Sequence, residues 1–87
     1  MEIKINDWTG YWNYFDRLCA MLKDNNKEDV VAQLRKAQLY VNGLTDGWFE
    51  FLYSFEEVIK NNKGELTKDE KELAEKLIAL LRKSIKL

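Results

Sequence analysis

The chain has 87 residues, of which 46% are hydrophobic and 33% are charged, with 14 basic and 15 acidic side chains. This length predicts one domain, and the net charge of −1 excludes a global attraction to nucleic acid or to an anionic membrane surface. The absence of proline, with only four glycines, argues against a disordered chain and against a β fold with many turns.

The first helix is predicted near residues 8–24, after a short extended N-terminal arm over residues 1–6. Because each helical residue turns by about 100°, the apolar and aromatic side chains of this helix fall within one arc of about 180°. Asp7 or Thr9 is the candidate N-cap. The arc contains Trp8, Tyr11, Trp12, Tyr14, Phe15, Leu18, Cys19, Met21 and Leu22.

The second helix is predicted near residues 27–42. Asn26 is the expected N-cap, and Glu28 and Asp29 occupy the first turn, where the helix dipole favours acidic side chains. Gly43 follows the last periodic position, where a left-handed residue often ends a helix. The shared apolar face consists of Val30, Val31, Leu34, Ala37 and Val41.

The third helix is predicted near residues 46–61, with Thr45 as its N-cap. Leu44 and Phe49 have the spacing of a hydrophobic staple, so the preceding segment is predicted to be a tight helix-to-helix joint. Gly64 is the expected C-cap. The core face consists of Trp48, Phe51, Leu52, Phe55, Val58 and Ile59.

The fourth helix is predicted near residues 68–85, and it begins with the clearest local signal in the chain. Thr67 and Glu70 have the spacing of a capping box, in which the two side chains satisfy free backbone amides at the helix start. The basic residues near the end of this helix match the negative end of its dipole, so we interpret them structurally and not as a nucleic-acid patch.

These four segments predict an all-α fold, a small antiparallel four-helix bundle that forms a single domain over residues 1–87. The joints between the segments are short, and short joints place successive helices side by side in opposite directions. The helices are expected to pack mainly through Trp12, Phe15, Leu34, Phe55, Leu77 and Leu81.

The outer face of the third helix carries the main functional hypothesis. Residues 44–60 contain four acids and one base, and helical spacing places two aromatic side chains among those acids. Aromatic anchors surrounded by charge are typical of binding hot spots and of electrostatically steered association. The predicted partner-binding residues are Asp46, Phe49, Glu50, Tyr53, Glu56 and Glu57, and the predicted partner is a basic protein. An inhibitor, antitoxin or immunity-type protein would use such a face.

Two alternatives remain open. The arc of the first helix is wider than the roughly 100° that a surface helix needs, so Tyr14, Leu18 and Met21 are candidates for a homodimer face. The N-terminal arm would cover the same residues equally well. The second alternative is an apolar ligand pocket inside the aromatic bundle.

Enzymatic chemistry is not expected, because the chain has no histidine and no nucleotide-binding or nucleophile motif. No cofactor or metal site is predicted, and Cys19 is expected to be a packed, inert thiol. No apolar stretch approaches the roughly 18 residues of a membrane span, and the start of the chain does not resemble a signal peptide. We therefore expect a cytoplasmic protein that binds neither membrane nor nucleic acid.

Overall fold

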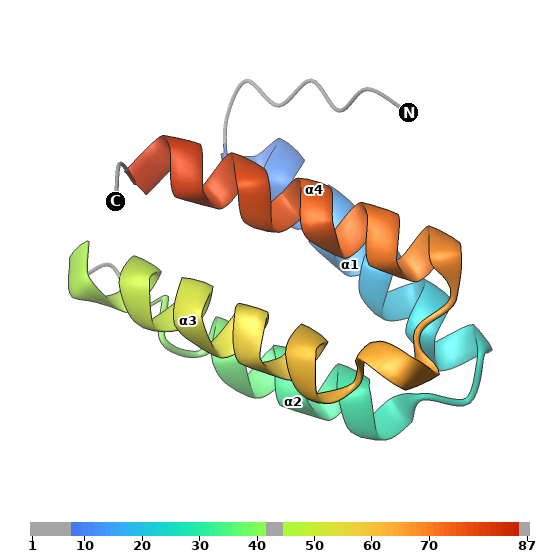
Figure 1. The fold of residues 1–87 in the computed structure, drawn as a ribbon. Coiled ribbons are helices and arrows are strands. Elements are labelled where there is room, and N and C mark those ends of the chain that lie inside the picture. Colours follow the sequence, from blue (N-terminus) through green and yellow to red (C-terminus); the bar gives the residue numbers. More distant parts are fainter. Residues whose placement is uncertain (1–7, 42–44, 86–87) are drawn as a thin grey trace.

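A computed structural model describes residues 8–41 and 45–85, with side chains placed for residues 10–41 and 47–84 (Figure 1). It contains α1 (Trp8–Asp24), α2 (Glu28–Gln38), α3 (Thr45–Asn61), the short 3₁₀ helix η1 (Lys63–Glu65) and α4 (Lys68–Ile85). Successive helices run in opposite directions, and each packs against its two neighbours, with α4 closing the ring against α1. The predicted all-α four-helix bundle is confirmed.

The core contains one apolar cluster to which all four helices contribute. Five of the six predicted packing residues have no exposed surface, whereas Trp12 is partly buried at the edge of the cluster. The five are Phe15, Leu34, Phe55, Leu77 and Leu81. A buried hydrogen bond joins the first and the last helix of the chain: the hydroxyl of Tyr11 in α1 donates to the carbonyl of Leu77 in α4 over 3.1 Å.

Aromatic side chains bridge the diagonal of the bundle between α1 and α3. The ring of Trp12 lies 5.8 Å from that of Trp48 and 5.3 Å from that of Phe51, measured between ring centroids. Phe15 makes edge-to-face contacts with Phe51 and Phe55, each at 5.6 Å. These separations lie in the favoured range for aromatic pairs, which adds to the free energy gained by burying the rings. The diagonal helices are thus linked by side chains.

The predicted bounds are correct for α1 and α4, while α3 begins one residue earlier than predicted. The prediction for α2 was too long, because this helix ends at Gln38. The amides of Tyr40 and Val41 donate to carbonyls three residues back, over 3.1 and 3.0 Å. Such bonds tighten the last turn of a helix and end its regular pattern. Apolar periodicity continued to Val41 and did not reveal this change.

The turn after α1 corrects another prediction, since Asn26 does not cap α2. It has a φ of 62° and occupies the left-handed position after α1. Its amide donates to the carbonyl of Lys23 and the amide of Lys27 donates to that of Leu22, over 3.0 and 2.8 Å. This pair of bonds is a Schellman motif, which asparagine tolerates better than most non-glycine residues. Lys27 is the N-cap of α2 and makes no side-chain cap bond.

The expected C-cap at Gly64 is also wrong. Gly64 lies inside η1 with no left-handed φ, and an added Cβ would meet nothing within 4 Å. The end of α3 is stabilised instead by Asn62, whose side-chain amide donates to the carbonyl of Val58 over 2.8 Å. Side-chain bonds to the last free carbonyls are an alternative way to end a helix.

Several predictions lie outside the described residues. These concern the arm at residues 1–6, the cap at Asp7, the glycine joint at residues 42–44 and the side chain of Asp46. Thr9 and Thr45 lie inside α1 and α3, which begin at Trp8 and at Thr45, so the N-caps predicted at these two threonines are wrong.

Candidate functional site

The six predicted partner-binding residues do not form one uniform surface, because the described side chains among them differ in burial. Asp46 lies in the first turn of α3, and its side chain is outside the described set. The other five side chains divide into a partly buried pair and an exposed group. We call the exposed group, Glu50, Tyr53 and Glu57, the acidic edge of α3.

The partly buried pair consists of Phe49 and Glu56. Glu56 forms an ion pair with Arg82 of α4. The side chain of Glu56 is 28% exposed and that of Arg82 is 56% exposed, so this pair adds little to stability because water screens it. It does neutralise the carboxylate of Glu56, which reduces the attraction of that carboxylate for a basic partner.

The acidic edge of α3 faces water. The residue Tyr53 is 56% exposed, and Glu50 and Glu57 are classed as exposed on either side of it in the sequence. Glu50 precedes Tyr53 by three residues and Glu57 follows it by four, so all three side chains share one stripe of the helix. Within the described part of the chain, neither carboxylate has a basic partner at ion-pair distance.

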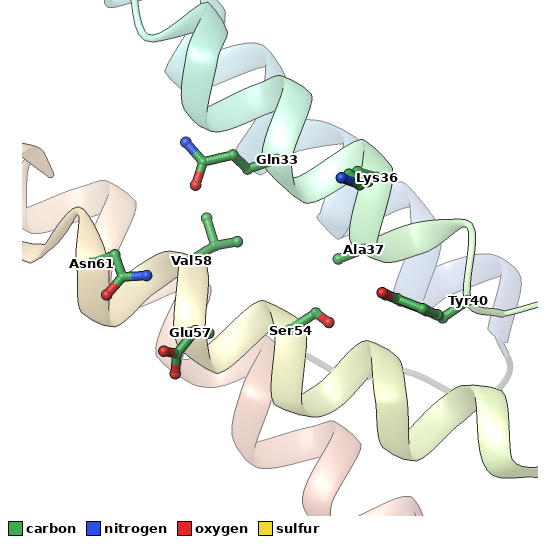
Figure 2. Close-up of a pocket in the computed structure, with 8 residues that line it drawn as sticks. All are labelled: Gln33, Lys36, Ala37, Tyr40, Ser54, Glu57, Val58 and Asn61. Carbon is green, nitrogen blue, oxygen red and sulfur yellow. The ribbon is translucent and has the colours of Figure 1, made fainter.

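A groove of about 260 Å³ runs between α2 and α3 beside this edge (Figure 2). Its base is formed by Ala37 and Val58, which are 2% and 8% exposed. The remaining lining residues are polar: Gln33, Lys36, Tyr40, Ser54, Glu57 and Asn61. Glu57 therefore belongs both to the acidic edge and to the wall of the groove. We call this feature the α2–α3 groove.

The α2 wall of the groove was not predicted from the sequence. Periodicity within one helix does not indicate which neighbouring helix the side chain of Tyr40 approaches. The pairing of α2 with α3 was expected from their short joint, whereas the alignment of Tyr40 with Ser54 and Glu57 depends on how the two helices cross. Only the structure reveals that alignment.

The large hydrophobic side chains that remain exposed are concentrated in this half of the molecule. They are Leu39, Tyr40 and Tyr53, at 77%, 44% and 56% exposure. Among the described side chains, α1 and α4 carry no large hydrophobic residue in that class. Isolated exposed apolar residues are common on proteins, and of these three only Tyr40 lines the groove.

The residues of the candidate dimer face on α1 are buried or partly buried within the bundle itself. Leu18 has no exposed surface, so its assignment to a dimer surface is corrected and it belongs to the core. Tyr14 and Met21 are partly buried against the core. The guanidinium of Arg17 lies 5.4 Å from the ring centroid of Tyr14, which covers part of that ring. The arc is wide because α1 packs against both α2 and α4.

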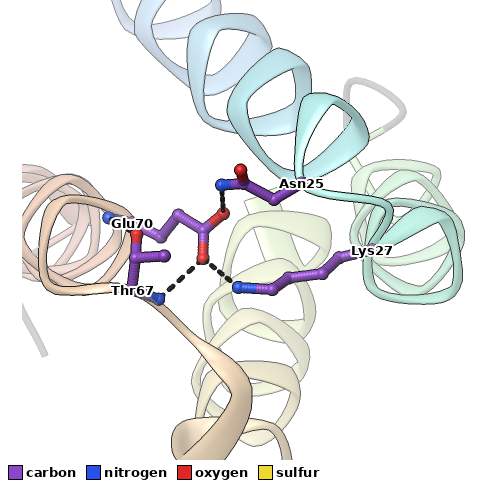
Figure 3. A network of polar contacts seen from close by, with 4 residues as sticks. All are labelled: Asn25, Lys27, Thr67 and Glu70. Carbon is purple, nitrogen blue, oxygen red and sulfur yellow. Dashed lines mark hydrogen bonds and ion pairs between the residues drawn. The ribbon is translucent and has the colours of Figure 1, made fainter.

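A second polar site lies at the opposite end of the bundle from the aromatic bridge (Figure 3). Glu70 has no exposed surface. Its Oε1 accepts hydrogen bonds from Lys27 Nζ at 2.6 Å and from the amide of Thr67 at 2.8 Å, and its Oε2 accepts one from Asn25 Nδ2 at 2.6 Å. The amide of Glu70 donates to Thr67 Oγ1 over 3.2 Å, so the predicted capping box is confirmed.

Burial by itself would raise the pKa of Glu70. The hydrogen bonds from Lys27, Thr67 and Asn25, together with the positive charge of Lys27, outweigh burial and hold the pKa below its ordinary value. All donors to this carboxylate come from the chain itself. The arrangement ties the α1–α2 turn to the start of α4, which is a structural role.

Reactive chemistry has little support among the described side chains. Cys19 is 3% exposed, and burial raises the pKa of its thiol; the nearby Asp16 also raises it, while Arg35 opposes the shift. A buried, protonated thiol is a poor nucleophile. The described residues contain no group of acidic, histidine or cysteine side chains arranged to hold a metal ion, and none of their helices is long and apolar enough to span a membrane.

Comparison with known proteins finds no matching family model, no matching curated protein and no matching solved structure.

Proposed function

We propose that this protein is a small interaction module that binds a basic partner protein through the acidic edge of α3. An inhibitor, antitoxin or immunity-type protein would act in this way, by covering a basic functional surface of its partner. The cytoplasmic location expected from the sequence is part of this proposal.

The observation that carries the proposal is the environment of Tyr53. Its ring is more than half exposed, and the two carboxylates beside it have no basic partner within the described part of the chain. A tyrosine contributes large contact area with few rotatable bonds, which suits a binding anchor. Unpaired carboxylates at the rim attract a basic surface and accelerate its association.

A photo-crosslinking experiment tests this proposal directly. Tyr53 is replaced by p-benzoylphenylalanine, and the full-length protein is irradiated in a lysate of its source cells. The matched control places the same group at Ala20, which is exposed on the outer face of α1. We expect a discrete crosslinked protein of basic isoelectric point from position 53 only, identified by mass spectrometry.

Charge reversal then tests the role of the acids. We expect the double variant Glu50→Lys/Glu57→Lys to lose the crosslinked partner, because like charges oppose association across an interface. The control variant Glu72→Lys/Glu75→Lys makes the same change in net charge on exposed positions of α4 and should retain it. Equal capture by both double variants would refute the assignment of binding to the acidic edge.

The homodimer and the internal ligand pocket receive less support. Burial of Leu18 removes one of three residues from the proposed dimer face, and the close ring contacts between α1 and α3 favour a filled core. Light scattering on the wild-type chain and on Tyr14→Lys/Met21→Lys is the measurement for the dimer, which predicts a halved mass in the variant.

A further inference from the structure

We propose that the α2–α3 groove receives an arginine side chain from the basic partner. This inference rests on the proposed function and assigns a residue type to one position of the partner. In this arrangement Tyr53 and Glu50 contact the surrounding surface of the partner, while the groove beside them takes a single long side chain.

The shape and lining of the groove match the two parts of an arginine side chain. The apolar base of Ala37 and Val58 suits its three methylene groups. The hydroxyls of Tyr40 and Ser54 point into the space between the two helices and supply acceptors, and the carboxylate of Glu57 lies at the outer rim of the α3 wall (Figure 2). A guanidinium carries five N–H donors in a planar fork and no acceptor, so it can bond to several such oxygens at once.

The charges around the groove favour a cation. Glu57 lines the α3 wall, and Glu50 lies one helical turn before Ser54 on that wall. On α2, Asp29 lies one turn before Gln33 and is exposed. Lys36 is the one cation that lines the groove. Lys60 lies one turn after Glu57 and is also exposed. Three carboxylates against two ammonium groups leave this face with a balance of −1, which favours a cation over an acidic side chain.

Arginine is favoured over lysine by the groove's geometry. A lysine ammonium has three donors on a compact, strongly hydrated head, whereas a guanidinium is less hydrated and stacks on aromatic rings. Tyr40 lines the groove and is 44% exposed, so part of this residue is accessible to an incoming side chain. A cation over such a ring adds to binding.

The test uses small probes and the intact protein. Backbone amide resonances are followed by NMR during titration with N-acetyl-arginine methylamide, and then with the corresponding lysine, norleucine and glutamate compounds. We expect the arginine compound to shift the amides of Ala37, Ser54 and Val58 together, with a smaller effect from lysine and none from norleucine or glutamate.

Two single variants make the expectation quantitative. Glu57→Gln should weaken binding of the arginine probe by about two- to fivefold, and Lys36→Gln should strengthen it by a similar factor, as exposed charge pairs usually do. The control Glu75→Gln removes an exposed acid from α4, a helix that contributes no residue to the lining of the groove, and should leave the affinity unchanged.

The outcomes separate this inference from the proposed function. Shifts at Glu50 and Tyr53 without shifts at Ala37 would overturn the groove as the arginine site while leaving the acidic edge in place. Equal shifts from norleucine, or weaker binding in Lys36→Gln, would also overturn it. Failure of the proposed function is read separately, as loss of specific crosslinking from position 53.

Discussion

At the scale of single residues, Glu70 combines complete burial with three incoming hydrogen bonds from three different residues. A buried carboxylate is stable only when its oxygens are paired, because burial without partners costs several kcal/mol. The partners here lie on both sides of the bundle end, in the α1–α2 turn and at the start of α4. The charge of Glu70 is therefore part of what holds these two segments together.

The pH dependence of stability follows from this arrangement. The pKa of Glu70 in the folded chain lies below its ordinary value of 4.5, so ionisation stabilises the fold above that value. This contribution is lost as the pH falls through the folded pKa. At pH 7 we expect Glu70→Gln to lower the free energy of unfolding by about 1.5 kcal/mol, because charge-assisted bonds become neutral ones. Urea unfolding at pH 7 and pH 3 measures the difference, which should shrink at pH 3.

Glu65→Gln is the matched control for this measurement. Glu65 is exposed in η1, and its side chain makes no ion pair within the described residues. Its substitution should change the free energy of unfolding by less than about 0.5 kcal/mol at either pH. A Glu70→Gln protein as stable as the wild type at pH 7 would show that the network contributes no net stability.

At the scale of elements, the helices were predictable and several of their ends were not. Periodicity located all four helices because each buries one continuous stripe, and the capping box at Thr67 is a local pattern within four residues. Asn26 was misassigned because asparagine suits both an N-cap and a left-handed position. Which of these two positions Asn26 occupies depends on the course of the backbone between α1 and α2, and tertiary packing determines that course.

The candidate site, too, was predictable only in part. The exposed acids and tyrosine of α3 follow from spacing within one helix. The pairing of Glu56 with Arg82 and the position of Tyr40 beside Ser54 join residues from different helices. Such contacts depend on how each helix is rotated about its axis and on the angles at which the helices cross. A projection of one helix contains no information on either. The same limit hid the bonds from Asn25 and Lys27 to Glu70.

The turn after α1 gives a prediction with opposite signs at two asparagines. Asn26 has a φ of 62°, and a β-carbon in that region costs roughly 1 kcal/mol, more for alanine than for asparagine. Asn26→Ala should therefore destabilise the protein by about 0.5–1 kcal/mol, whereas Asn26→Gly should be neutral or stabilising. Chemical denaturation of both variants measures the two effects.

Asn13 provides the control, since it is exposed in the middle of α1 and has no positive φ. Asn13→Ala should stabilise slightly, because alanine has the higher helix propensity. If Asn26→Ala were as harmless as Asn13→Ala, the left-handed turn would not contribute to closing α1.

At the scale of the whole molecule, the two ends of the bundle are held by different chemistry. Aromatic rings bridge α1 and α3 at one end, and the Glu70 network joins the α1–α2 turn to α4 at the other. Each α-helix also packs against two neighbours. No helix can leave without exposing part of the shared core, so we expect the bundle to unfold as one cooperative unit.

The single cysteine makes this cooperativity measurable. Cys19 is 3% exposed and its pKa is raised by burial, so a thiol reagent should react with it only after the chain opens. Leu77 is fully buried in α4, on a different helix. If opening is global, Leu77→Ala should accelerate labelling of Cys19 by at least about 30-fold, which corresponds to a loss of about 2 kcal/mol. A labelling rate that does not respond would mean that α1 opens locally.

The same assay verifies the binding variants, because their substitutions lie on the surface. Glu50→Lys/Glu57→Lys changes exposed side chains that make no ion pair within the described residues. We expect its labelling rate to stay within about fivefold of the wild type, since exposed substitutions usually change stability by less than about 0.5 kcal/mol each, or about 1 kcal/mol for the pair. Loss of the partner at an unchanged labelling rate would place the defect in binding. Loss accompanied by labelling as fast as in Leu77→Ala would place it in folding, and the acidic edge would then lose its support.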